Sequence, residues 1–238
     1  MKNELTRRRF LGATGAVAAA GAIAETPAAR AGQPDSSAGT VKILGIGCSP
    51  RAESTTATAV QACLDAARLV APDRIEVELI ALAGMKIPGE VAAGVPLEAD
   101  ARDDFPPLVP KLSNPQVAGI IIGSPVYFGN MSSLCKAFLE RLMTLRKNDF
   151  ALSGKVGGVL AVGGARNGGQ ELTVRSIQTA LFCQEMIVVG ESRPTAHFGA
   201  GVWNNAEFGG VANDEVGMKA VANLGRRVAE VALALASR

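Results

Sequence analysis

From residue 41 onward, short apolar runs alternate with stretches of helical periodicity. The run 117–123 is continuously apolar, as a strand buried on both faces requires, whereas 75–80 alternates strictly and predicts a strand with one polar face. The expected strands are residues 41–47, 75–80, 117–123, 156–162 and 186–190, and the expected helices are 54–71, 103–112, 132–145, 170–183 and 214–236. This alternation predicts an α/β fold of three layers, in which a five-stranded parallel sheet carries helices on both faces.

Ligands of such sheets bind beyond the carboxyl ends of the strands, where the winding direction switches. The loops after the first, third and fourth strands are therefore the expected location of the chemistry. The first loop reads Gly47-Cys-Ser-Pro-Arg-Ala-Glu-Ser-Thr-Thr, and its hydroxyl groups, Arg51 and the following helix dipole suit a phosphate monoester. It lacks the lysine motif of nucleoside triphosphatases and the GxGxxG spacing of dinucleotide sites. The alternative is a Ser/Thr helix cap that binds no ligand.

The second and third loops carry a more specific pattern. The second loop and its helix read GSPVYFGNMSSLCKAFLER, and the third reads GGARNGGQELT. Together with CSPRAESTT in the first loop and DEVGMKAVANLGRRVAE near the C-terminus, these segments resemble the flavodoxin-like NAD(P)H-dependent FMN reductases, including their iron–sulfur flavoprotein branch. The resemblance covers residues 41–238, and it implies a flavodoxin-like FMN-binding domain over that range.

The resemblance assigns three groups of residues to FMN. The phosphate would be held by Ser49, Arg51, Ser54, Thr55 and Thr56. The ribityl chain and ring would be lined by Pro125, Val126, Tyr127, Phe128, Gly129 and Asn130. The pyrimidine end would meet Gly163, Gly164, Arg166, Asn167, Gly168 and Gly169, whose N–H groups would stabilise the charge of reduced flavin. Some of these glycines are alternatively explained by a tight strand-to-helix turn.

The activity implied by the resemblance is that of an FMN-dependent oxidoreductase. NAD(P)H would deliver hydride to the flavin, which would pass electrons to a quinone or a free flavin, and no side chain is assigned as catalytic. The expected assembly is a homodimer or homotetramer. One alternative is a non-enzymatic electron shuttle of flavodoxin type; another is a protein of this fold that has lost flavin and binds a different phosphorylated ligand.

The cysteines depart from the pattern of the iron–sulfur branch. That branch carries a compact cysteine cluster after the second strand, where residues 85–95 contain no cysteine here, so no iron–sulfur cluster and no metal are expected. Cys48, Cys63, Cys135 and Cys183 are scattered without a CxxC motif, so neither a zinc site nor a disulfide framework is indicated. Buried free thiols are expected for the last three. Cys48 is either a small residue tolerated by a tight loop or a thiol of lowered pKa.

The only histidine and the only tryptophan, His197 and Trp203, share one expected loop. One histidine without spaced partners does not build a zinc site, so a structural or rim-lining role is expected for it. Trp203 would either cap a flavin or anchor a subunit interface.

The first 31 residues have the parts of a signal peptide. Thr6-Arg-Arg-Arg-Phe-Leu precedes an apolar Ala/Gly run and resembles the twin-arginine export signal, with cleavage expected after Ala31 and a flexible linker over 32–40. The expected location is periplasmic or otherwise exported, with the twin-arginine machinery as a partner; an uncleaved anchor or a basic tail is the alternative. Without the leader, 19 basic and 20 acidic residues remain. That balance disfavours both nucleic-acid binding and an acidic electron shuttle.

Overall fold

The computed structural model describes residues 39–205 and 210–237, all of which belong to one unit of the chain, Asp35–Arg238. The predicted leader and most of the predicted linker lie outside the described residues. Among the helices that are described, none is long and apolar enough to cross a membrane.

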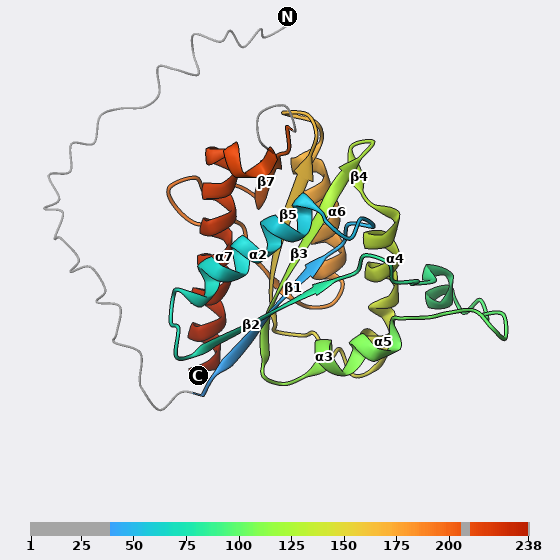
Figure 1. Cartoon of the computed structure of the whole chain (residues 1–238). Coiled ribbons are helices and arrows are strands. Elements are labelled where there is room, and N and C mark those ends of the chain that lie inside the picture. The colour runs from blue at the N-terminus through green and yellow to red at the C-terminus, as the bar shows by residue number, and fades with distance from the viewer. Residues whose placement is uncertain (1–38, 206–209, 238) are drawn as a thin grey trace, which may run out of the picture. The chain divides into compact units, whose positions relative to one another are not determined.

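A parallel sheet forms the centre of the fold, with its strands in the order β2-β1-β3-β5-β6 (Figure 1). These strands are β1 (Val41–Gly47), β2 (Ile75–Ala81), β3 (Val117–Tyr127), β5 (Val156–Gly163) and β6 (Ile187–Val188). The register places Ile43 beside Val77 of β2 and Gly119 of β3. The predicted parallel sheet of five strand positions is therefore confirmed.

The fifth position of the sheet differs from the prediction. The expected strand 186–190 is reduced to the two residues of β6, and a strand that the sequence analysis did not predict, β7 (Ala200–Trp203), pairs with the carboxyl half of β5. The sequence analysis missed β7 because Gly199, which directly precedes it, is typical of a turn. A Cβ at Gly199 would lie 2.4 Å from the carbonyl oxygen of Val159, so only glycine allows this close approach of the backbones.

The second departure is at the end of β3, which continues past residue 123 and turns back. A short antiparallel strand, β4 (Asn130–Met131), pairs with Val126 and Tyr127. The turn residues Phe128 and Gly129 both have positive φ, as a two-residue hairpin turn of type I′ requires. Part of the predicted second loop is thus a β-hairpin.

The predicted helices are present with small changes of boundary. They are α2 (Thr55–Arg68), α3 (Val109–Ser113), α4 (Ser133–Arg141), α5 (Met143–Lys147), α6 (Gln170–Phe182) and α7 (Glu215–Ala236), with 3-10 turns at Gly89–Ala93, Pro106–Leu108 and Gly210–Asn213. The expected helix 103–112 is short and irregular because prolines interrupt it. The expected helix 132–145 is divided at Leu142 into α4 and α5.

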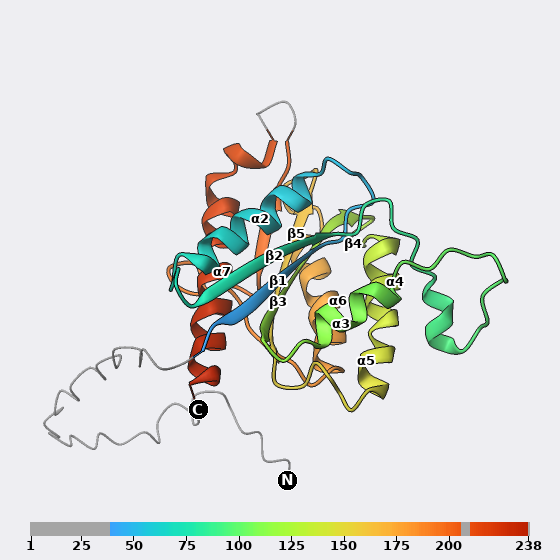
Figure 2. The same ribbon diagram turned by 60° about the horizontal axis from the view of Figure 1, so that its bottom comes forward.

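Two hydrophobic cores lie on the two faces of the sheet. Residues such as Leu44 and Ile120 face one core with α3 to α6, whereas Ile43 and Ile121 face the other with α2 and α7. Figures 1 and 2 show these helices on opposite sides of the sheet. Alternate residues of β1 and β3 are therefore buried on opposite faces, which explains their continuously apolar sequence.

Candidate functional site

The loops that follow β1, β3 and β5 lie side by side because these strands are neighbours in the sheet. Two hydrogen bonds hold the first loop against the second: the Cys48 amide donates to the Gly123 carbonyl over 2.8 Å, and the Ser132 hydroxyl donates to the Cys48 carbonyl over 2.7 Å. The structure thus brings together the three loops that the sequence analysis selected.

The first loop ends at the N-terminus of α2. Ser54 caps this helix by accepting a hydrogen bond from the Ala57 amide over 3.1 Å, and the buried Ser49 hydroxyl accepts one from the Arg51 amide over 3.2 Å. The amides of Thr55 and Thr56 lie in the first turn, where no intrahelical acceptor exists. Arg51 is exposed and its guanidinium bonds to no described residue, so a hydroxyl-rich helix end and a cation face solvent at the carboxyl ends of the strands.

The hairpin of β3 and β4 presents two aromatic side chains to solvent. Tyr127 and Phe128 are exposed, and the Phe128 side chain has no cover from any described residue. The Asn130 side chain accepts from the Met131 amide over 2.8 Å, and Pro125 is buried inside β3. The exposed aromatic residues of this hairpin can contact a ring; Pro125 acts instead by shaping the end of the strand.

The third loop, after β5, is held by Gln170, a buried residue that the sequence analysis did not identify. Its amide nitrogen donates to the Ala165 carbonyl over 2.7 Å. Asn167 and Gly169 have positive φ, and no described residue accepts a hydrogen bond from the amides of 165–167. This loop therefore offers backbone donors to a ligand.

The second and third loops touch through their backbones. A Cβ at Gly169 would lie 2.7 Å from the Gly129 Cα, whereas a Cβ at Gly164 would meet nothing within 4 Å. Gly169 is thus required for packing, and Gly164 leaves bare backbone next to open space. Hydroxyls and a cation at a helix N-terminus, exposed aromatic rings and free loop amides together fit the phosphate and the ring of FMN.

Arg166 takes a position that the sequence did not indicate. Its guanidinium carbon lies 4.5 Å from the centre of the Trp203 ring, and Trp203 Nε1 donates to the Gly164 carbonyl over 3.3 Å. Trp203 therefore supports the third loop from the side of β7. His197 lines a hollow on that same side, as a rim-lining role implies.

Cys48 is completely buried, and this burial together with the neighbouring Cys135 raises the pKa of its thiol well above the usual value. The alternative of a thiol with lowered pKa is therefore wrong. Cys63 and Cys135 are buried free thiols as predicted, but Cys183 is exposed, which corrects the prediction for that residue.

An ion pair holds the long segment between β2 and β3. The buried Arg141 of α4 binds the Asp103 carboxylate over 2.7 Å and donates to the Pro88 carbonyl over 3.2 Å, while its guanidinium carbon lies 4.8 Å from the centre of the Phe105 ring. Within the described ranges, no cluster of three or more His, Cys, Asp or Glu side chains is arranged to hold a metal ion.

Comparison with known proteins gives three findings. Residues 41–200 match the model of the family described as NADPH-dependent FMN reductase. An iron–sulfur flavoprotein of Methanocaldococcus jannaschii is 39% identical over 194 residues, which cover 80% of this chain and 97% of that protein. An NAD(P)H dehydrogenase (quinone) of Paracoccus denitrificans is 49% identical over 71 residues, covering 30% of this chain and 34% of that protein.

Solved structures show the same fold at low sequence identity. The apo form of an NADH:FMN oxidoreductase superimposes with a TM-score of 0.58 at 21% identity, covering 80% of this chain and 89% of that chain. This likeness extends to the parallel sheet with helices on both faces.

Proposed function

This chain belongs to the NADPH-dependent FMN reductase family and is a flavin-dependent oxidoreductase, and we propose that it binds FMN in the three loops and reduces a quinone or a free flavin with NAD(P)H. The observation that carries this proposal is the convergence of a hydroxyl-rich helix N-terminus, an aromatic hairpin and a bare-backbone loop at the ends of β1, β3 and β5.

The N-terminus of α2 would hold the phosphate. The free amides of Thr55 and Thr56 and the hydroxyls of Ser49 and Ser54 are hydrogen-bond donors, and Arg51 supplies a full positive charge. Ser54 keeps its hydroxyl hydrogen for a ligand while its oxygen caps the helix, so helix stability and phosphate binding are compatible at the same residue.

The second and third loops would hold the ring. When bound, FMN supplies hydride acceptance and electron transfer, and the protein supplies binding and orientation. Tyr127 and Phe128 would cover the ring, and the exposed backbone of 164–167 would donate hydrogen bonds where negative charge develops. Gly163, Gly168 and Gly169 shape this loop. We assign no side chain as a general acid or base.

The cysteine positions support a flavoprotein without an iron–sulfur cluster. Cys48 and Cys135 are buried in the core on one face of the sheet, Cys63 is buried in the core on the other face, and Cys183 is exposed at the end of α6. Four cysteines divided between two cores and the surface do not converge on one cluster.

The N-terminal residues support a further part of the proposal, which is export. Three consecutive arginines before an apolar run fit recognition by the twin-arginine machinery, which moves folded proteins, so FMN would be inserted before transport to the periplasm. We also propose a homodimer or homotetramer, with the exposed Phe128 as a residue that a second subunit would cover.

The visible spectrum of the full-length protein, purified from an export-competent host, tests the cofactor. Flavin absorbance and the release of FMN on denaturation are expected. A colourless protein that cannot be reconstituted with FMN would contradict the proposed site. Anaerobic mixing with NADH or NADPH then tests the reaction: bleaching of the flavin and turnover on a quinone are expected, and a flavin that neither nucleotide reduces would exclude them as donors.

A further inference from the structure

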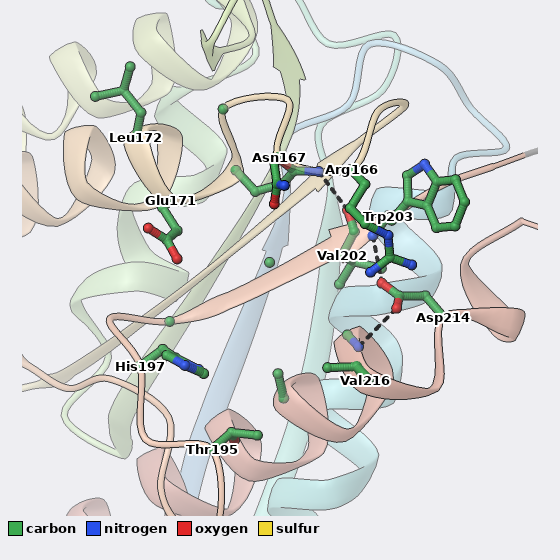
Figure 3. A pocket seen from close by; sticks show the side chains of 16 residues that line it. Arg166, Asn167, Glu171, Leu172, Thr195, His197, Val202, Trp203, Asp214 and Val216 are labelled. Carbon is green, nitrogen blue, oxygen red and sulfur yellow. Dashed lines mark hydrogen bonds between the residues drawn. The ribbon is translucent and has the colours of Figure 1, made fainter.

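A hollow of about 660 Å³ lies along β7, between the first turns of α6 and α7 (Figure 3). It shares Arg166, Asn167 and Gly169 with the third loop, but no residue of the first loop or of the hairpin lines it. The hollow is therefore separate from the proposed phosphate site. Its volume falls within the range of small-molecule sites in proteins, about 300–1,000 Å³.

One side of the hollow offers hydrogen-bond donors. Arg166 is stacked on Trp203, and the indole is itself fixed by its bond to the Gly164 carbonyl. Stacking leaves the N–H groups at the edge of the guanidinium free for an anion. Asn167 adds a side-chain amide on the wall of the hollow. A carboxylate is the group that matches these donors.

The opposite side offers acceptors. His197 and Glu171 lie there, across the hollow from Arg166 (Figure 3). The Nδ1 atom of His197 lies 2.7 Å from the carboxylate of Glu191, whose side chain is only 1% exposed. Because a carboxylate only accepts, Nδ1 carries the hydrogen, and in the neutral tautomer this leaves Nε2 as the acceptor.

Other bonds fix Glu191 and so fix the ring of His197. The Thr195 hydroxyl donates to the second carboxylate oxygen of Glu191 over 2.5 Å, and the Asn223 amide of α7 donates to the Thr195 hydroxyl over 2.8 Å. Buried side chains therefore fix the orientation of the imidazole, and no described residue forms a hydrogen bond with its Nε2 atom.

The wall between the two sides is apolar. Val202, Val216 and Ala220 line it there, and the Val216 side chain is 69% exposed. Asp214 also lines the hollow, but its carboxylate already accepts from the Trp203 amide over 2.7 Å and from the Gly217 amide over 3.2 Å. Its two carboxylate oxygens are therefore turned toward backbone amides.

We propose that this hollow binds a small aromatic carboxylate that carries a hydroxyl group at the far end of its ring system. Arg166 holds the carboxylate, the ring lies against Val216, and the hydroxyl donates to Nε2 of His197. This site adjoins the third loop that is proposed to bind FMN. Flavin content and probe binding are measured separately, so the proposed function and this proposal can fail separately.

Calorimetry on the full-length protein, with its FMN content measured, tests the acceptor side. The probes are 6-hydroxy-2-naphthoate and 2-naphthoate, which differ only in the hydroxyl. We expect the hydroxylated probe to bind at least about fivefold more tightly, and His197→Gln, which keeps a donor toward Glu191, to abolish that preference. A preference that persists in His197→Gln, as binding at the flavin face would give, or an absence of binding overturns the proposal.

A matched pair of arginine variants tests the donor side. Arg175 of α6 is also exposed and stacked on an aromatic ring, with its guanidinium carbon 4.7 Å from the centre of the Phe198 ring, but it does not line the hollow. Arg166→Gln is expected to weaken the binding of both probes about tenfold, whereas Arg175→Gln is expected to leave their affinities unchanged. Equal effects of the two variants would overturn the assignment of the carboxylate to Arg166.

Discussion

Ser132 and Cys48 are 84 positions apart in the sequence, and the Ser132 hydroxyl donates a buried 2.7 Å hydrogen bond to the Cys48 carbonyl. The same hydroxyl oxygen accepts from the Cys135 amide over 3.0 Å and so caps α4. One side chain therefore joins the first loop to the helix that follows the second.

Ser132→Ala is expected to lower the free energy of unfolding by about 1–3 kcal/mol, because it removes a helix cap and leaves a buried carbonyl without its donor. Denaturant unfolding measures the change. The neighbouring Ser133 is exposed, so Ser133→Ala serves as the control and is expected to be close to neutral. Equal stability of the two variants would show that the bond between the loops contributes nothing.

Arg51→Ala is expected to weaken FMN retention by about 1–3 kcal/mol through loss of charge pairing with the phosphate. Equilibrium dialysis or fluorescence of released FMN measures the affinity. Arg68 is exposed near the other end of α2, and Arg68→Ala is expected to retain FMN as the unaltered protein does. Unchanged retention in Arg51→Ala would remove that residue from the site.

Gly169→Ala is expected to destabilise the protein by about 1–3 kcal/mol even without FMN. The new Cβ would lie 2.7 Å from the Gly129 Cα, and the residue has a φ of +105°. Gly164→Ala meets nothing within 4 Å, so its stability without FMN is expected to be unchanged while its FMN affinity falls. Thermal unfolding and FMN titration of both variants separate packing from binding.

Gly225→Ala in α7 is expected to lower stability by about 1–3 kcal/mol, although alanine favours an isolated helix by about 1 kcal/mol. The reason is that a Cβ at Gly225 would lie 2.0 Å from the Cys63 carbonyl oxygen of α2, so the two helices must move apart. Lys219→Ala, at an exposed position of the same helix, is the control for denaturant unfolding. A stabilised Gly225→Ala variant would contradict this packing.

Glu78 gives a pH dependence. Its hydrogen bonds with Lys111 and Lys42 lower the pKa of its carboxyl below the usual 4.5. The pair therefore stabilises the fold above pH 4.5, and this contribution is lost as the pH falls through the lowered pKa.

Glu78→Gln should accordingly lower the free energy of unfolding by less than about 1 kcal/mol at neutral pH, because the ion pairs are partly exposed. In strong acid it should not change the free energy of unfolding. Glu76 of β2 forms no ion pair with any described residue, and Glu76→Gln is the control. Denaturant unfolding at several pH values measures the difference. A destabilisation by Glu78→Gln that grows as the pH falls would contradict this prediction.

The sheet was predictable where its strands are continuously apolar. β1, β3 and β5 are buried on both faces, so their sequences need no partner to be recognised. The edge was not predictable, because β7 includes Gly201 and follows Gly199, whose role depends on the close approach of the Val159 carbonyl. That contact is a property of the folded molecule.

The candidate site likewise combines contacts that the sequence indicates with contacts that only the folded structure shows. The cap of α2 by Ser54 is local, and the sequence of the first loop indicates it. Ser132 and Gln170 act through groups that come close only after folding, and the pair of His197 with Glu191 depends on the path of the segment between β6 and β7. No spacing rule covers these contacts.

The sheet edge that β6 and β7 divide between them is short, and side chains already bind some of its backbone groups. The outward Trp203 amide is taken by Asp214, and the Phe198 carbonyl, just before β7, by the Gln178 side chain. An exposed strand with free backbone groups is a template for aggregation, and here the strand is short and helix side chains already occupy these groups. A strand from another copy that approached this edge would find the Trp203 amide and the Phe198 carbonyl already bonded.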